Sequence, residues 1–327
     1  MVTSTVDDDF LTKADPLRRE LFAHCYRMVG SVHDAEDLVQ ETYLRAWRAY
    51  DRFEGRSSLR TWLYRIATTT CLTALENRQR RPMPTGLGAS AHPDDDVTEH
   101  PEVPWLEPVP DTMIGATRSD PATIVATRAS TRLALIAALQ HLPSRQRAVL
   151  LLRDVLAWRA AEVADLLGTS TAAVNSILQR ARTQLGQAAP DEDQITEPTT
   201  QHQRELLDRY VQAFEKKDIP AIVELFSTDI VWEMPPLAEW YRGPEHVGRH
   251  LALRCPGGAE DIRMVETSAN GQPAFAQYLR DPALPGGDFL AFNLQVLSFS
   301  GNRITHVANF LDPALFENFD LPMRLPG

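Results

Sequence analysis

Prolines crowd residues 82–121, and this crowding constrains the fold of the chain more than any other feature. They are Pro82, Pro84, Pro93, Pro101, Pro104, Pro108, Pro110 and Pro121. A proline inside a helix removes a hydrogen bond and clashes with the preceding turn, so no long helix can cross this segment. The run Asp94-Asp95-Asp96 adds self-repulsion. We therefore expect an acidic, proline-rich linker over residues 83–128 between separately folded parts.

A second short linker, at residues 189–200, leaves three modules at residues 10–82, 129–188 and 200–327. The net charge of −11 disfavours nucleic-acid binding if the chain is taken as a whole. However, residues 16–82 hold twelve basic against eight acidic side chains, and residues 130–188 hold seven against three. Residues 189–327 hold eleven against 21. A polyanion would therefore be attracted to the first two modules and repelled by the third.

Several classes of protein are disfavoured by what the sequence lacks. No apolar run approaches the roughly 20 residues that a membrane span needs, and the acidic N-terminal stretch does not resemble a secretory signal. The three cysteines, Cys25, Cys71 and Cys255, are odd in number and widely spaced. We expect reduced thiols in a cytoplasmic protein that uses no membrane and no cofactor.

The second module has the pattern of a helix-turn-helix. A short helix from Ala160 is followed by Gly168 and by a second helix that opens at Ser170, with Val163, Val174 and Leu178 among the shared core positions. Short polar residues near the start of such a helix suit base edges, and later arginines suit phosphates. The candidate DNA-binding residues are Ser170, Thr171, Asn175, Ser176, Gln179, Arg180 and Arg182. The alternative is a helical hairpin that only packs on a partner.

The first module is expected to be all helical. Asp34 is a plausible N-cap for a helix in which Ala35, Leu38 and Trp47 share the apolar face. A loop with aromatic and basic residues follows, a combination that suits single-stranded DNA. Its candidates are Phe53, Arg56, Ser57, Ser58, Arg60, Thr61, Trp62 and Arg65, with Arg78, Arg80 and Arg81 extending the basic surface. Alone, this cluster slightly favours the alternative that Trp62, Tyr64 and Ile66 are partly core and the arginines form a solvated face.

The order of the motifs identifies a family resemblance. The segments are DAEDLVQETYLRAW at 34–47, FEGRSSLRTWLYRIA at 53–67, NRQRRP at 77–82 and LPSRQRAVLLLRDVLAWRAAEVADLLGTSTAAVNSILQRAR at 142–182. Together they resemble regions two and four of the sigma-70 family in its extracytoplasmic-function (ECF) group. The resemblance implies that Asp34, Asp37, Gln40 and Glu41 bind the beta-prime clamp helices of RNA polymerase core. It implies that the Phe53–Arg65 segment captures the melted minus-10 element, that the helix from Ser170 binds the minus-35 element, and that the second module sits on the beta flap.

The third module is expected to be α+β, with helices at 203–215 and 219–226 before strands at 230–234, 274–279, 289–299 and 303–310 in an antiparallel sheet. Tyr241-Arg-Gly-Pro-Glu and Phe310-Leu-Asp-Pro-Ala-Leu-Phe resemble the SnoaL-like, NTF2-like cone fold. The overall prediction is a multidomain chain with two all-α domains and a C-terminal NTF2-like cone. Pocket candidates in this fold are Trp232, His246, Tyr278 and His306, with His250 and Asp281 as further acid–base possibilities.

Two smaller features remain open at this point. Trp105-Leu-Glu-Pro resembles a linker motif of sigma factors that carry a fused C-terminal domain, although the spelling differs, and Trp105 is expected to dock on that domain or on the second module. His246 and His250 stand four residues apart near Cys255, but without a further ligand they predict no metal site.

Three hypotheses follow. The first is a sigma factor that directs polymerase core to promoter DNA and is regulated by its acidic C-terminal domain, with or without a small ligand. The second is a SnoaL-like hydrolase or cyclase, or a ligand sensor, fused to a DNA-binding module. The third, a plain helix-turn-helix repressor, leaves the Asp34–Trp47 and Phe53–Arg65 segments unexplained.

Overall fold

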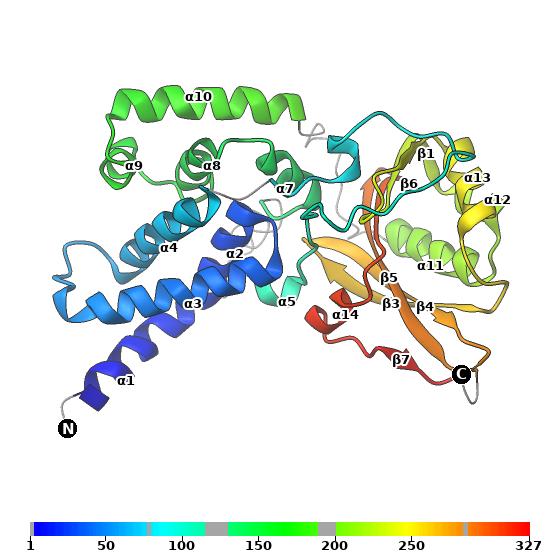
Figure 1. The fold of residues 1–327 in the computed structure, drawn as a ribbon, viewed down its shortest axis with the longest axis horizontal. Coiled ribbons are helices and arrows are strands. Elements are labelled where there is room, and N and C mark those ends of the chain that lie inside the picture. The colour runs from blue at the N-terminus through cyan, green and yellow to red at the C-terminus, as the bar shows by residue number, and fades with distance from the viewer. Residues whose placement is uncertain (1–2, 77–79, 115–129, 189–200, 284–286) are drawn as a thin grey trace. The chain divides into compact units, whose positions relative to one another are not determined.

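The computed structural model describes residues 3–76, 80–114, 130–188, 201–283 and 287–327 (Figure 1). The chain forms two compact units. The helical unit comprises residues 1–81 and 106–190, and the α+β unit comprises residues 82–105 and 191–327. Arg78 lies outside the described residues, as do the whole second linker and residues 115–128 of the first.

The described part of the helical unit consists of short and medium helices. They are α1 (Thr3–Ala14), α2 (Arg18–Val29), α3 (Val32–Ala49), α4 (Leu59–Leu75), α5 (Asp111–Ile114), α7 (Leu133–Gln140), α8 (Ser144–Leu150), α9 (Ala160–Leu167) and α10 (Thr171–Ala188). Every residue of α2 from Leu21 to Val29 is buried, including His24 and Arg27. A helix buried on all sides is a central element, and α2 contacts α3, α4, α5, α7 and α8.

One helix boundary in this unit differs from the expected one. Ser31, rather than Asp34, caps α3, because its hydroxyl accepts the Asp34 backbone N–H at 3.2 Å. Helix α4 ends at Leu75. Ser58 caps α4 through the N–H of Thr61 at 3.1 Å, so both helices begin with the serine hydroxyl cap that satisfies free backbone donors.

Gly30 ends α2 in the left-handed conformation, with φ of 73°. A Cβ at this position would lie 2.7 Å from a Leu106 methyl carbon, so the linker packs directly against the glycine. The Glu107 N–H donates to the Gly30 carbonyl at 3.0 Å, and the Glu107 carboxylate accepts the Val32 N–H at 2.8 Å. Residues 106–110 are therefore bound to the turn between α2 and α3.

The α+β unit has a curved sheet with helices α11–α13 packed against it (Figure 1). Its elements are α11 (Gln201–Glu215), α12 (Ile219–Glu224), β1 (Phe226–Glu233), β2 (Trp240–Arg242), α13 (Pro244–Arg254), β3 (Ile262–Ala269), β4 (Gln272–Arg280), β5 (Phe289–Ser300), β6 (Arg303–Phe310), α14 (Leu315–Asn318) and β7 (Arg324–Leu325). The strand order is β2-β1-β6-β5-β4-β3, and β7 pairs with β5.

One prediction about this sheet is wrong, because β1 and β6 pair in parallel while the other neighbours are antiparallel. The antiparallel run β3-β4-β5-β6 brings β6 back beside β1 in the same direction, and only the tertiary arrangement reveals that meeting. The turn at Gly301-Asn302 joins β5 to β6, with Gly301 at φ of 56°.

Residues 82–105 form a strap along the α+β unit. The strap backbone is bound at several points, with Ala91 N–H donating to Trp240 O at 2.8 Å and His100 N–H donating to Pro236 O at 3.0 Å. Arg249 on α13 grips the Asp94 carboxylate through both of its oxygens at 2.7–2.9 Å. The acidic run expected to extend a free spacer is instead bound by arginine, and the Trp105 indole donates within the strap to His100 O at 3.0 Å.

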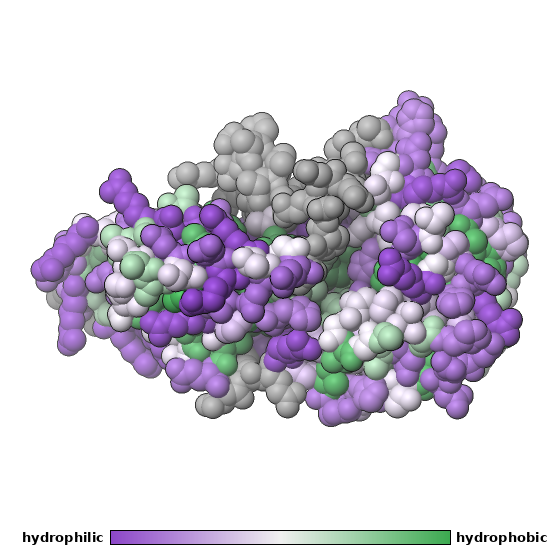
Figure 2. Space-filling model, turned by 90° about the horizontal axis from the view of Figure 1, so that it is seen from above, coloured by the Kyte–Doolittle hydropathy of each residue, from purple (hydrophilic) through white to green (hydrophobic). Residues whose placement is uncertain are grey.

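Hydrophilic residues cover much of the face drawn in Figure 2. Among the residues that the structure describes, no helix has the length and apolar character needed to cross a bilayer.

His24 gives the helical unit a defined response to acid. Its Nε2 lies 3.0 Å from Thr68 Oγ1, whose own hydrogen is donated to Tyr64 O, so Nε2 is the donor. Burial, and secondarily Arg27, lowers the pKa of His24 from 6.5 to about 3. Between pH 6.5 and about 3, His24 is therefore protonated in the unfolded chain but neutral in the folded chain. The free energy of unfolding falls as the pH falls through this range.

We expect His24→Gln to remove about 1.4 kcal/mol per pH unit from the pH dependence of unfolding between pH 6 and 4. Urea unfolding followed by circular dichroism at a series of pH values measures this slope. The matched control is His202→Gln, at an exposed position on α11. Equal slopes for the wild type and His24→Gln would contradict the assignment.

Candidate functional site

Helix α10 presents all of its predicted DNA-binding side chains to solvent. Val174, Leu178 and Ala181 are buried against the rest of the helix-turn-helix. The exposed residues are Ser170, Thr171, Asn175, Ser176, Gln179, Arg180 and Arg182. The Ser170 hydroxyl also caps the helix by accepting the Ala173 N–H at 3.2 Å. Arg182 is held by Asp154 through two bonds of 2.7 and 2.9 Å, which leaves Arg180 as the more available of the two cations.

The aromatic and basic cluster before and within α4 is assembled as a surface. The rings of Phe53 and Trp62 lie 4.8 Å apart between centroids, and Tyr50 stacks on Phe53 at 6.3 Å. Trp62 is half-buried whereas Tyr64 is in the core with 2% exposure, so the alternative reading of core aromatics holds for Tyr64. The polar candidates Arg56, Ser58 and Arg60 are exposed, and Ser57 and Thr61 are half-buried.

Most arginines in this region have acidic partners. Arg60 pairs with Glu20 at 2.7 Å, and Arg65 pairs with Asp165 of the helix-turn-helix at 2.7 Å. Arg56 pairs with Glu54. Arg80 contacts the His141 ring at 3.1 Å. These pairs are largely exposed and contribute roughly 0–1 kcal/mol each, so DNA phosphates can compete for the same guanidinium groups.

The polymerase-binding candidates on α3 divide into two groups. Asp34 is 8% exposed, and its carboxylate accepts from Arg81 at 2.8 Å, so the expectation that it faces a partner is wrong. Asp37 and Gln40 are exposed and Glu41 is half-buried. Trp47 also departs from its expected place in the core, because it is 47% exposed. With Leu44, at 48% exposure, it adds an apolar patch beside the polar candidates, which the helical spacing alone did not reveal.

Two buried arginines hold the first and second modules together. Arg27 of α2 donates to the Ser130 carbonyl and hydroxyl at 3.1 and 2.7 Å. Arg147 of α8 donates to Met28 O, to the Gln140 side chain at 2.7 Å and to the Gln140 and Leu142 carbonyls. Burial lowers the pKa of both guanidinium groups to about 10. Neutral carbonyl oxygens therefore carry most of the compensation for these buried charges.

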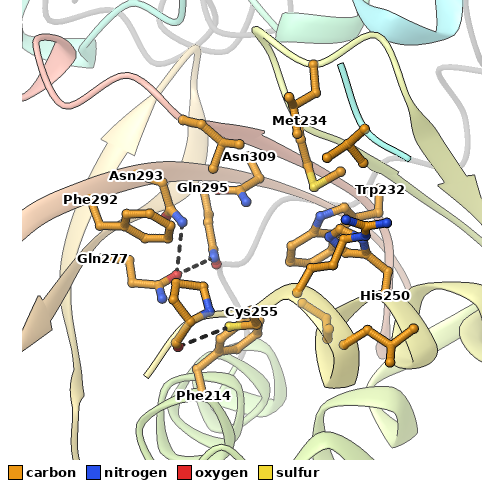
Figure 3. Close-up of a pocket in the computed structure, with 17 residues that line it drawn as sticks. Phe214, Trp232, Met234, His250, Cys255, Gln277, Phe292, Asn293, Gln295 and Asn309 are labelled. Atoms are coloured by element: carbon orange, nitrogen blue, oxygen red, sulfur yellow. Dashed lines mark hydrogen bonds between the residues drawn. The ribbon is translucent and has the colours of Figure 1, made fainter. Parts of the chain in front are cut away.

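The α+β unit contains a cavity of about 430 Å³ between the sheet and the helices. Figure 3 shows the side chains of Gln277, Asn293 and Gln295 on one side of this cavity, facing Trp232 and His250 on the other. Apolar side chains such as Phe214, Met234 and Phe292 fill the remaining wall. The strap contributes Val97, helix α13 contributes Arg254, and Cys255 follows directly after that helix.

Of the four predicted pocket residues, only Trp232 lines the cavity. Strand alternation places Glu233 and His306 on the opposite face, where His306 Nε2 lies 2.7 Å from the Glu233 carboxylate. Tyr278 likewise points away and donates to Pro322 O at 2.9 Å. The ring of His246 stacks edgewise on His92 of the strap at 5.4 Å. The predictions for His246, Tyr278 and His306 as pocket residues are therefore wrong.

His250, named from the sequence as an acid–base possibility, does line the cavity, but four amide side chains that the sequence did not single out line it as well. Tyr210 donates to Gln295 Oε1 at 2.7 Å, and Gln295 and Asn293 both donate to Gln277 Oε1, at 2.9 and 3.2 Å. Asn293 and Gln295 stand two apart on β5 between apolar residues, and this repeated inward amide is the signal that could have indicated them. Their apolar neighbours are also buried, which hid the alternation.

Five buried polar atoms at this cavity have no hydrogen-bond partner among the described residues. They are Trp232 Nε1, His250 Nδ1, Gln277 Nε2, Asn293 Oδ1 and Asn309 Oδ1. Each belongs to a side chain that is at most 6% exposed. Buried polar groups are nearly always paired in folded proteins, so such a cluster marks a position where hydrogen bonds can be made to something else.

The environment of the cavity favours the neutral forms of His250 and Cys255. Burial, and then Arg254, lowers the pKa of His250 to about 4, and burial raises the pKa of the Cys255 thiol. None of the seventeen lining residues is Asp or Glu. Within the described part of the chain, no three His, Cys, Asp or Glu residues are grouped closely enough to bind a metal ion.

Comparisons with known families match the three parts of the chain. Residues 14–81 match sigma-70 region 2, residues 132–185 match sigma-70 region 4, and residues 207–307 match the SnoaL-like domain. The chain is 55% identical over 320 residues to "ECF RNA polymerase sigma factor SigG" of Mycobacterium tuberculosis, covering 97% of this chain and 85% of the relative. This chain belongs to the ECF RNA polymerase sigma factors. The family resemblance and the multidomain fold class are thereby confirmed, and the rival enzyme and repressor hypotheses are not favoured.

A second sigma factor shares the whole architecture. The ECF sigma factor SigJ of Mycobacterium tuberculosis is 29% identical over 251 residues, which is 74% of this chain and 72% of the relative. Its crystal structure matches with a TM-score of 0.61 and 23% identity, covering 96% of this chain and 99% of SigJ. The fold of this sigma factor, with its C-terminal cone, is therefore the fold of SigJ.

Arg147 is one of the two buried arginines that hold regions 2 and 4 of this sigma factor together. We expect Arg147→Ala to lower the free energy of unfolding of the helical unit by about 2–4 kcal/mol. The substitution leaves the Met28 and Gln140 acceptors unpaired. Arg145→Ala is the control, because Arg145 is exposed on the same helix and donates to Leu167 O. Chemical denaturation compares the two variants, and equal losses would show that burial of Arg147 is unimportant.

Proposed function

We propose that this sigma factor uses the exposed face of α10 for the minus-35 element and the Phe53–Arg65 segment, with Arg78, Arg80 and Arg81, for the minus-10 element. The exposure of the α10 polar residues, opposite the buried side chains of Val174, Leu178 and Ala181, is the observation that carries this proposal. A recognition helix needs free side chains at its N-terminal end, and Ser170 through Gln179 supply them. The division into domains at 10–82, 83–128, 129–188 and 200–327 belongs to the same proposal.

For polymerase core we propose binding through the α3 face, with Asp37, Gln40 and Glu41 meeting basic residues of the beta-prime clamp helices. Leu44 and Trp47 support this proposal, because exposed tryptophan is typical of interface hot spots. The beta flap is the proposed partner of the second module.

Promoter binding requires regions 2 and 4 to separate. The elements centred at minus 10 and minus 35 lie on the order of 85 Å apart along B-form DNA, at about 3.4 Å per base pair. In the structure the two regions are in contact, and Asp165 occupies Arg65, one of the proposed minus-10 residues. The arrangement described here is therefore proposed to be a closed state that opens on polymerase.

We propose that the SnoaL-like domain modulates this activity without catalysing a reaction. The strap supports a modulating role, because the chain that connects regions 2 and 4 is bound by α13 of that domain. The absence of carboxylates from the cavity lining and the neutral state of His250 near pH 7 support a non-catalytic cavity, since acid–base catalysis needs a group that titrates near the working pH.

Substitutions on α10 test the minus-35 proposal. We expect Arg180→Ala to weaken binding to promoter and random duplexes alike and to reduce the slope of log K against log salt by about 0.9, as loss of one phosphate contact does. Asn175→Ala should instead relax the preference at one base position by about 1–3 kcal/mol. Polymerase holoenzyme binding to labelled promoter fragments measures both, with Arg204→Ala on α11 as the charge-matched control. Unchanged binding by both α10 variants would remove this helix from the promoter interface.

Reversing the charge that holds the strap tests the modulating role. Arg249→Glu places a carboxylate opposite Asp94, so we expect the strap to detach and run-off transcription with core polymerase to change by at least about threefold, the effect of losing roughly 0.7 kcal/mol. Arg204→Glu is the control, since it makes the same change of charge on an exposed part of α11. Equal transcription from the wild type and Arg249→Glu would exclude regulation through the strap.

A further inference from the structure

We propose that the cavity of the α+β unit is a receptor site for one uncharged, partly aromatic small molecule that carries both a hydrogen-bond donor and an acceptor, and that its occupancy stabilises the docked strap. The link to the strap rests on the modulating role proposed above. The binding site itself rests only on the cavity and its unpaired polar atoms.

The unpaired atoms define which hydrogen-bonding groups the ligand must carry. Asn293 and Asn309 offer carbonyl oxygens, which accept hydrogen bonds, while Trp232 and Gln277 offer N–H groups, which donate. All four side chains are at most 5% exposed, so bulk water reaches them poorly. A molecule with a primary amide, or with adjacent hydroxyl and carbonyl groups, satisfies both kinds of group at once.

The rest of the wall selects for a flat apolar body. Phe214 and Trp232 stack nearly parallel, 6.2 Å apart and 12° between planes, and Phe292 lies on the amide side. A cavity of about 430 Å³ is within the usual range for small-molecule sites. Aromatic walls and a few fixed polar groups are the usual composition of such sites.

Charge complementarity excludes ionic ligands as the preferred class. No lining carboxylate is present to pair with a cation. Arg254 is the lining cation, but it is exposed at the rim and donates to the Asp95 carbonyl of the strap at 2.7 Å, beside the acidic run. An anion buried among neutral amides would lose its hydration without gaining a partner, which is costly.

The strap forms part of the cavity wall through Val97. Val97 packs against the core of the unit, and its neighbour Thr98 donates its N–H to the Glu239 carboxylate at 3.1 and 3.2 Å. A ligand that touches Val97 binds only the docked strap with full affinity. Ligand binding therefore shifts the strap toward its docked state by mass action.

Three probes of one shape test the ligand class on the full chain. They are 2-naphthamide, 2-naphthoate and 2-methylnaphthalene, with binding followed by calorimetry and ligand-observed NMR. With roughly 13 non-hydrogen atoms, the amide is expected to bind with a Kd on the order of 1 mM or lower, at least tenfold more tightly than the other two. Equal binding of all three probes, tightest binding of the carboxylate, or no binding of the amide at 10 times that concentration (~10 mM) would each overturn the proposal.

Variants locate the binding in the cavity. Trp232→Phe keeps the ring and removes one donor, and Asn309→Leu keeps the volume and removes one acceptor. Each is expected to weaken 2-naphthamide binding by about threefold to tenfold, the effect of one hydrogen bond. Asn318→Leu, at an exposed position on α14, is the control. Circular dichroism confirms folding, and unchanged affinity in both folded cavity variants would overturn the site.

Hydrogen exchange tests the link to the strap. At ten times Kd, exchange of the Ala91, Thr98 and His100 amides is expected to slow about tenfold, because opening then requires ligand release. Binding without slower exchange would overturn the coupling. Transcription by Arg249→Glu is a separate measurement, so failure of the modulating role is distinguishable from failure of the binding site.

Discussion

Contacts along residues 82–110 hold the linker between regions 2 and 4 against folded surfaces. The docked strap, one part of the cavity wall and the turn after α2 all depend on these contacts. Its first part is bound to the α+β unit by backbone hydrogen bonds and by Arg249 on Asp94. Its continuation is bound to the turn after α2 through Glu107, whose carboxylate accepts from Val32 N–H and from Arg81. A proline-rich chain loses little entropy when it is held in an extended form, which makes this mode of binding favourable.

The helical unit is organised around buried charges more than around ion pairs. Arg27 and Arg147 are at most 4% exposed and are compensated by carbonyl and hydroxyl oxygens. Such groups stabilise one specific arrangement, because a shift of either region would leave a buried guanidinium without its acceptors. The exposed pair of Arg65 and Asp165 adds little energy but occupies a residue proposed to bind DNA.

The cavity of the SnoaL-like domain differs from what catalysis by a carboxylate or histidine would need. The acidic residue beside Trp232 on β1 is Glu233. Its carboxylate faces away from the cavity, where it contacts His306 and accepts the Thr85 N–H. The inward side instead carries amides joined in a chain from Tyr210 to Asn293. Amides bind without exchanging protons, which supports the proposal that the cavity recognises a ligand, and the polar chain also keeps its own members rigid.

The sequence by itself determined the module order, the helix-turn-helix and most strands, because these follow from proline placement, local charge and short-range periodicity. The exposure of the polar α10 side chains follows from the sequence for the same reason, since one buried stripe fixes the opposite side of a helix, while their role in DNA binding stays a prediction. Only the tertiary structure decided which face of β4 and β6 lines the cavity and that β1 pairs with β6 in parallel. It also decided that Asp34 is buried and Trp47 is exposed, the reverse of what the sequence predicted. These outcomes depend on contacts between residues distant in sequence, and a strand buried on both faces carries no local signal that tells one side from the other.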